Sequence, residues 1–199
     1  GKPHTRDWYV AVAEMNNKSS FGRLTSAFGP RRNFECDTER SAAEHLLGRF
    51  GSGSGVVAGR RILMLAEAHS SIWRHVVWLD RYTQGVQTLQ SLTSLIAAAS
   101  DVDDALVLIS LDAFGDLGTA LETLVNFRLD VPYCPIVVAS RDFAGHVLSS
   151  DRRAISDTSL RLPASRAEIA ICCGAAVENN RRFNAGRLAG NNPPLSLVP

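Results

Sequence analysis

Glu67, Asp112 and Ser140 are polar side chains that each come just after a short, almost wholly apolar run of the chain. The runs are RILML at 61–65, ALVLISL at 105–111 and PIVVA at 135–139. Runs of this length without alternation are typical of strands buried on both faces of a parallel sheet. The carboxyl ends of such strands share one edge, where open α/β proteins bind ligands and perform chemistry. The sequence therefore predicts that two carboxylates and one hydroxyl converge in a ligand site.

The elements that must position these side chains alternate between strands and helices. We expect strands at Arg61–Leu65, Val86–Leu89, Ala105–Leu111, Pro135–Ala139 and Ser159–Leu162. We expect helices from Ser70 or Ser71 to Tyr82, at Ser91–Ser100, at Gly118–Asp130, at Phe143–Ile155, and after a cap at Ser165. Such alternation implies right-handed crossovers with helices on both faces of the sheet. The predicted fold class is α/β, a flavodoxin-like (βα)5 doubly wound parallel sheet of strand order 2-1-3-4-5.

On the residues Arg61–Glu67, Asp112, Ser140 and Pro163, the stretch 59–180 resembles the receiver domain of two-component response regulators. In that family an acidic pair after the first strand binds Mg²⁺, and an aspartate after the third strand accepts a phosphoryl group from a histidine kinase. A Ser or Thr after the fourth strand and a Lys after the fifth strand hold the phosphoryl oxygens. Carboxylate oxygens suit a hard cation, and metal and lysine together neutralise the charge of the transferring group.

The resemblance implies a role for each matching position. Asp112 takes the place of the phosphoacceptor, and Ser140 that of the hydroxyl that contacts the phosphoryl group. Glu67 and Asp112 take the places of the Mg²⁺ ligands. Two-component signal transduction in bacteria is the setting that these roles imply, with Asp112 as the site of a phosphoprotein.

Three positions depart from the family pattern. The first acid is Ala66, the lysine is Leu162, and the aromatic switch position is Ser159. Loss of one metal carboxylate and of the lysine removes much of the charge that makes phosphoryl transfer workable. Arg161 is not a replacement for the lysine, because adjacent side chains of a strand point to opposite faces. We therefore interpret the domain as a degenerate receiver, or pseudo-receiver.

The predicted function is signalling through protein–protein interaction, not enzymatic catalysis, with phosphorylation of Asp112 weak or absent. The alternative is a phosphorylatable receiver that uses Asp112 with Mg²⁺ held by an atypical set of acids. Expected partners are a histidine kinase, a phosphotransfer protein or a regulator, or a second copy bound through the last helix region. Candidate partner-binding residues are Trp73, Trp78, Leu46 and Phe50. Because Trp73 and Trp78 lie five positions apart, one of them is expected to be in the core.

The segments outside this domain have their own patterns. Residues 1–50 are predicted to be an arm with a short amphipathic helix near 38–50, which is a regulatory segment, a partner peptide or a helix packed on its own domain. Residues 51–58 are a flexible Gly/Ser linker, either natural or an engineered joint. The formal GxGxxA within it lacks the preceding strand that dinucleotide binding requires. Residues 181–199 are predicted to be a polar tail.

Composition restricts the classes of function. The chain has 199 residues and a net charge of +1, so no basic field suggests nucleic acid as a partner. Its four cysteines lack zinc-binding spacing, which favours a reducing, cytoplasmic setting. No apolar run approaches the roughly 20 residues that span a bilayer, and no signal peptide is expected.

Other ligand-binding and catalytic classes lack their motifs. The stretch Ala66–Ser71 has no glycine-bearing phosphate cradle for FMN, and only Glu67 and His69 mimic the start of a cobalamin loop. No GxSxG nucleophile elbow is present. His69 and His75 do not share a helical face, which disfavours a metal pair.

Overall fold

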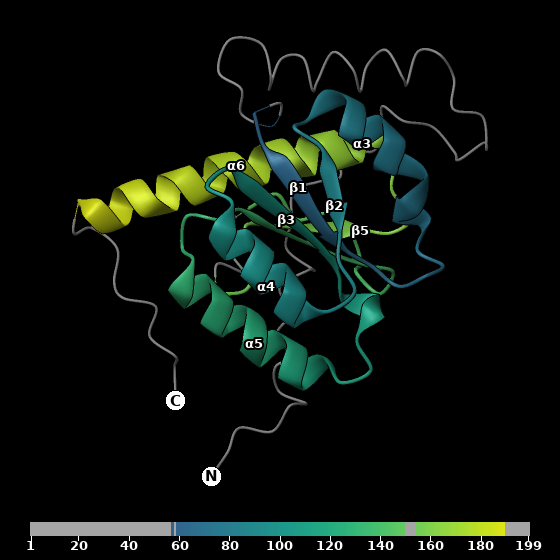
Figure 1. Ribbon diagram of the computed structural model, residues 1–199, viewed down its shortest axis with the longest axis horizontal. Helices are drawn as coiled ribbons and strands as arrows, with labels where there is room; N and C mark the ends of the chain where they lie inside the picture. The colour runs from purple at the N-terminus through teal and green to yellow at the C-terminus, as the bar shows by residue number, and fades with distance from the viewer. Residues whose placement is uncertain (1–56, 58, 150–153, 190–199) are drawn as a thin grey trace.

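A single five-stranded sheet organises the computed structural model, which describes residues 57, 59–149 and 154–189 (Figure 1). Its strands are β1 (Arg61–Leu65), β2 (Val86–Thr88), β3 (Ala105–Ser110), β4 (Ile136–Ser140) and β5 (Thr158–Arg161). They are all parallel, in the order β2-β1-β3-β4-β5, which confirms the predicted flavodoxin-like class. The predicted arm helix with Leu46 and Phe50, and nearly all of the linker, lie outside the described residues.

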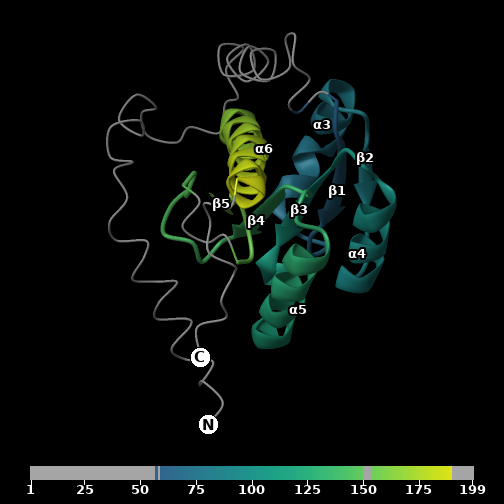
Figure 2. The ribbon, with the colours of Figure 1, turned by 90° about the vertical axis from the view of Figure 1, so that its left-hand side faces the viewer.

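Helices cover both faces of the sheet. They are η4 (Ser71–His75), α3 (Val76–Tyr82), α4 (Leu92–Asp101), η5 (Leu111–Ala113), α5 (Leu117–Asp130) and α6 (Arg166–Leu188). The α3 and α6 helices pack on one face, and α4 and α5 on the other (Figure 2). None of the helices in these residues is both long enough and apolar enough to cross a membrane.

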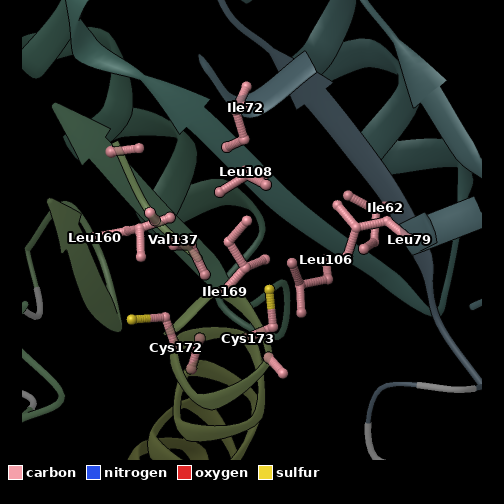
Figure 3. Close-up of a cluster of buried hydrophobic side chains, with 14 of the residues drawn as sticks. Ile62, Ile72, Leu79, Leu106, Leu108, Val137, Leu160, Ile169, Cys172 and Cys173 are labelled. Carbon is pink, nitrogen blue, oxygen red and sulfur yellow. The ribbon is translucent and has the colours of Figure 1, made fainter. Parts of the chain in front are cut away.

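The core explains why the strands read as unbroken apolar runs. All six residues of β3 are buried, because its alternate side chains enter two different core layers. Leu106 and Leu108 meet Ile169 and Cys173 of α6 (Figure 3). On the opposite face, Ala105, Val107 and Ile109 meet α4 and α5. Burial on both faces thus fixes β3 at the centre of the sheet, with its carboxyl end at the predicted site.

Polar caps set the starts of three helices. Ser91 begins α4 with a capping box to Ser94, and Ser165 begins α6 with a capping box to Glu168. Both starts agree with the prediction. Asp116 caps α5 by accepting the backbone N–H of Thr119.

The helix predicted at Phe143–Ile155 is wrong over the residues that the structure describes, 143–149 and 154–155, which form turns, bends and one isolated bridge. Val147 exchanges two 2.8 Å backbone hydrogen bonds with Ser159 of β5, antiparallel to it. The segment is extended because it covers the outer edge of β5, which would otherwise expose unpaired backbone groups. The fourth strand–helix repeat of the predicted (βα)5 pattern therefore has no helix in these residues.

The polar tail predicted from residue 181 begins too early, because α6 continues to Leu188. Asn180 and Asn184 lie on the buried side of α6, and each donates a 3.0 Å hydrogen bond to the backbone oxygen of Pro132. Asn184, which falls in the predicted polar tail, is thus a partner of a buried backbone group. The sequence pattern missed this contact because its two ends lie far apart in the chain.

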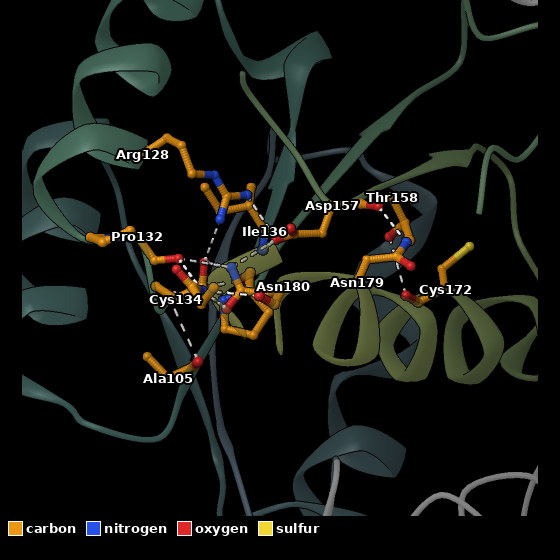
Figure 4. Close-up of polar contacts among 12 residues, drawn as sticks. Ala105, Arg128, Pro132, Cys134, Ile136, Asp157, Thr158, Cys172, Asn179 and Asn180 are labelled. Atoms are coloured by element: carbon orange, nitrogen blue, oxygen red, sulfur yellow. Dashed lines mark hydrogen bonds and ion pairs between the residues drawn. The ribbon is translucent and has the colours of Figure 1, made fainter. Parts of the chain in front are cut away.

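A buried ion pair ties α5 to the residue before β5, close to Asn180 (Figure 4). The guanidinium of Arg128 lies 2.7 Å from the carboxylate of Asp157, and the two side chains are only 1% and 5% exposed. Asp157 also accepts the backbone N–H of Ile136, and Arg128 donates to the backbone oxygen of Cys134. Burial raises the pKa of Asp157, and Arg128 opposes that rise.

Of the two tryptophans proposed to bind a partner, Trp78 belongs to the core. It is 6% exposed and packs with α6 residues, so its prediction as a docking residue is wrong. Trp73, in η4 directly before α3, is half-buried and packs against the same core cluster. The expectation that one of the pair is core is confirmed.

Candidate functional site

Asp112 lies directly after the central strand, in the single turn η5. Its side chain is 8% exposed, and both carboxylate oxygens accept hydrogen bonds from the chain. Oδ1 accepts the Ser140 hydroxyl over 2.6 Å. Oδ2 accepts the backbone N–H and the side-chain Nε of Arg141, each over 3.0 Å. The structure therefore brings Asp112 and Ser140 together as predicted, and it adds Arg141 to them.

Ser140 is held by bonds in both directions. It ends β4 and is buried, and its Oγ accepts the backbone N–H of Asp142 over 3.1 Å while its hydroxyl proton is directed at Asp112. Its backbone oxygen accepts the N–H of Leu162. Strand β4 and the turn after it thus fix the hydroxyl against the carboxylate.

Arg141 supplies positive charge to the site. The hydrogen bond from Arg141 to Asp112 raises the pKa of the guanidinium, and the negative charges of Asp112 and Glu67 add to that rise. Arg141 is therefore within electrostatic reach of both predicted carboxylates. Its side chain is 68% exposed, so the charge is presented from the solvent side.

Glu67 has a different partner from Asp112. Its Oε2 accepts the hydroxyl of Ser110 over 2.7 Å, and its backbone oxygen accepts the indole N–H of Trp73 over 2.7 Å. Ser110 ends β3, so the β1 loop is attached to the central strand through this bond. Glu67 thus lies at the predicted edge of the sheet but hydrogen-bonds to its neighbouring strand.

In this arrangement the predicted Mg²⁺ ligands are hydrogen-bonded within the chain. Both oxygens of Asp112 and one of Glu67 accept hydrogen bonds from the protein. Over the described ranges 57, 59–149 and 154–189, no group of three or more His, Cys, Asp or Glu side chains is placed to hold a metal ion. A hard cation would have to displace Arg141 or Ser140 to reach Asp112.

The remaining positions of the resemblance are apolar or used by backbone pairing. Leu162 is 3% exposed and belongs to the core, so no amine occupies the lysine position. Ser159 is buried, and its backbone pairs with Val147. Arg161 is exposed and donates to the backbone oxygen of Ala144, which agrees with its expected direction away from Leu162.

Two residues of the site were not identified from the sequence. Ser110 is a polar residue inside an apolar run, and that interruption is a usable signal. Arg141 directly follows Ser140, but only the turn after β4 brings its N–H and its Nε to the same oxygen. The spacing of residues alone does not predict that turn.

A second polar cluster joins the segment after β4 to α6. His146 Nε2 lies 2.9 Å from Glu168, and its Nδ1 accepts the backbone N–H of Arg161 over 3.1 Å. Burial opposes ionisation of Glu168, but hydrogen bonds from His146 and Ser165 lower its pKa to about 2. This cluster fixes the covering segment against β5 and α6.

Comparisons with known proteins find likeness to solved structures. No family model matches the chain, and no curated protein matches it. A solved structure described as a response regulator receiver domain protein from Clostridium thermocellum is similar, with 13% sequence identity and a TM-score of 0.46. The match covers 62% of this chain and 98% of that one. The flavodoxin-like class of this chain rests on its own strand order and parallel pairing.

Proposed function

We propose that this protein is a signalling protein whose receiver-like domain acts mainly through protein–protein interaction, with phosphorylation of Asp112 weak or absent. The observation that supports the proposal is the closed state of the Asp112 carboxylate, which accepts three hydrogen bonds from Ser140 and Arg141. These bonds use three of the roughly four lone-pair positions of the carboxylate, so a ligand would compete with Ser140 and Arg141 for Asp112.

The chemistry of phosphoryl transfer explains why this closure matters. A carboxylate that attacks a phosphoryl group needs an accessible oxygen, and the transferred group needs cations around it. Here Arg141 already neutralises Asp112, while Ala66 and Leu162 stand where the resemblance requires an acid and a lysine. The three differences all reduce transfer, since one metal carboxylate and the amine are absent and the nucleophile is hydrogen-bonded to Arg141.

The alternative function is a phosphorylatable receiver in which Mg²⁺ is held by Glu67 and Asp112. One observation favours it: the side chain of Arg141 is 68% exposed, and ion pairs with such exposed partners contribute little to stability. Displacement of the guanidinium would free Oδ2 of Asp112 for a metal or a phosphoryl group.

Amide NMR of the full chain, titrated with Mg²⁺ and then with beryllium fluoride, separates the two functions. The proposal predicts a folded spectrum without saturable shifts at Glu67, Asp112 or Ser140. Saturable shifts at these residues that disappear in Asp112→Asn would establish the phosphorylatable alternative. Asp112→Asn is the matched control, because it preserves the shape of the side chain and removes the nucleophile.

The partner is then a protein, such as a histidine kinase, a phosphotransfer protein, another regulator or a second copy. The last helix remains the candidate for self-association, because α6 is the longest of the described helices and extends past the sheet (Figure 1). Sedimentation equilibrium of the full chain tests this: a single monomeric species across the micromolar range would contradict the homodimer.

A further inference from the structure

A groove of about 710 Å³ lies beside the closed Asp112 site, along the carboxyl ends of β1, β2 and β3. Its walls are the stretch 65–68 after β1, the stretch 88–93 that leads into α4, and residues of η5 and of the first turns of α5. The volume falls within the range of small-molecule sites, so the groove has room for a side chain together with its neighbours. Asp112 does not line the groove, so this hollow is separate from the Asp112 carboxylate.

Aromatic and aliphatic side chains give the groove an apolar component. Trp73 and Phe114 both line it and are half-buried, and Leu89 and Leu92 line it from the β2 side. The indole of Trp73 is anchored by its 2.7 Å hydrogen bond to the backbone of Glu67. An anchored ring offers a fixed surface on which a flat or aliphatic group can pack.

The ionisable side chains of the groove are all acidic. Glu67 and Asp116 line it, and no Lys, Arg or His is among its lining residues within the described chain. Hydrogen bonds from Thr119 lower the pKa of Asp116, so this carboxylate stays ionised. Two negative charges next to two aromatic rings are the chemistry that recognises a cation.

Two helices begin at the groove, and their N-terminal ends would favour an anion. Asp116 itself caps α5 and offsets the positive end of that helix. The remaining end, that of α4, is equivalent to roughly half a positive charge, against roughly one and a half negative charges that remain on the two carboxylates. Arg141 reaches Glu67 electrostatically but does not line the groove. The balance therefore favours a positively charged occupant.

We propose that this groove binds an arginine- or lysine-bearing segment of a partner protein, with the cation between Glu67 and Asp116 and its aliphatic stem against Trp73. The proposal depends on the proposed function only in taking the occupant to be a protein. The negative charge of the groove favours a basic side chain, and its apolar lining favours aliphatic residues next to that side chain.

The test is a titration of the full, isotope-labelled chain with the capped peptide Ac-Ala-Leu-Arg-Leu-Ala-NH₂, followed by amide NMR. The matched control peptide carries citrulline, a neutral isostere, in place of arginine. We expect saturable shifts at 88–93, at Phe114 and at the Trp73 indole. We expect the citrulline peptide to bind at least ten-fold more weakly.

Variants assign the binding to the two carboxylates. In the double variant Glu67→Gln and Asp116→Asn, affinity for the arginine peptide should fall to that of the citrulline peptide. Asn caps helices about as well as Asp, and Gln can still accept from Ser110, so the fold should be preserved. Glu122→Gln is the control, because Glu122 is an exposed carboxylate on α5 that does not line the groove.

Three results of the peptide titrations would overturn the proposal. They are equal affinity for the two peptides, unchanged affinity in the double variant, and no shifts at millimolar arginine peptide. Shifts of the groove resonances on charge reversal of Arg31 and Arg32, with no peptide added, would also overturn it, because the occupant would then be this chain's own basic stretch. For this comparison the Mg²⁺ and beryllium fluoride titration is read at Asp112 and Ser140, which do not line the groove, so each proposal can fail without the other.

Discussion

Arg141 binds one oxygen of Asp112 twice, through its backbone N–H and through its guanidinium, each over 3.0 Å. The backbone bond survives any substitution at this position except proline, whereas the guanidinium bond depends on the side chain. The two contributions to closure of Asp112 can therefore be separated by mutation.

Replacement of Arg141 by Ala should open the site to a metal. We expect Mg²⁺ to produce saturable NMR shifts at 66–67 and 111–113 in the variant and none in the parent protein, because the competing cation is gone. Fold stability should change little, since the side chain is mostly exposed. Arg161→Ala is the control, as that guanidinium donates to Ala144. Identical titrations of Arg141→Ala and the parent would show that Arg141 does not close the site.

Breaking the buried pair of Arg128 and Asp157 from one side should be costly. Arg128→Met leaves a buried carboxylate without its cation, and such changes cost about 3–5 kcal/mol of unfolding free energy. The double variant Arg128→Met with Asp157→Asn should be more stable than Arg128→Met alone, because the amide is neutral and still accepts from Ile136. Urea unfolding measures both values. If the double variant lost as much unfolding free energy as Arg128→Met and Asp157→Asn lose together, the two side chains would not be coupled.

Glu168 should make stability fall in acid. Its pKa is about 2 in the folded protein, against 4.5 for the ordinary side chain. A lowered folded pKa stabilises the folded state above the unfolded value, and this stabilisation is lost as the pH falls from about 4.5 to about 2. Melting temperatures measured from pH 6 to pH 2 should therefore decline less steeply in Glu168→Gln than in the parent. Parallel curves for Glu168→Gln and the parent would show that Glu168 does not cause the loss of stability in acid. Glu122→Gln is the control, because it removes an exposed carboxylate from the same protein.

The buried thiols should be inert while the protein is folded. Burial raises the pKa of Cys134 and of Cys173 to about 12, and it also raises that of Cys172. Cys36 lies outside the described residues, so it is replaced by Ser to leave the three buried thiols alone. Because the thiolate is the reactive form, this variant should react with a disulfide reagent only as fast as it unfolds. The rate should be compared in buffer and in urea. Stoichiometric labelling within seconds in buffer would contradict this burial.

The sequence predicts the sheet well, because burial on both faces leaves a local signature. The apolar runs of β1, β3 and β4 match the observed strands within a residue or two. The failure at Phe143–Ile155 has a tertiary cause: Val147 pairs with the edge of β5, and that contact overrides helical spacing. Likewise, the carbonyl of Pro132 decides that Asn180 and Asn184 are buried, and nothing in the neighbouring residues predicts it.

The candidate site was only partly predictable for a related reason. Asp112 and Ser140 follow from the ends of adjacent parallel strands, and the structure joins them by a 2.6 Å hydrogen bond. Glu67 was placed at the correct edge, but its bond to Ser110 depends on which rotamers pack there. The role of Arg141 depends on one turn of backbone, which composition and periodicity do not determine.

The position of Arg141 in the chain, directly after Ser140, has a consequence for control of the protein. A cation that is covalently part of the chain cannot be diluted or chelated, so Arg141 competes with any free metal for Asp112 at every metal concentration. Under the proposed function, no acyl phosphate forms whose hydrolysis would set a lifetime for the signal. The fraction of protein bound to its partner then varies continuously with the partner concentration by mass action. The duration of the signal is set by how long the partner is present, not by hydrolysis of a phosphoryl group.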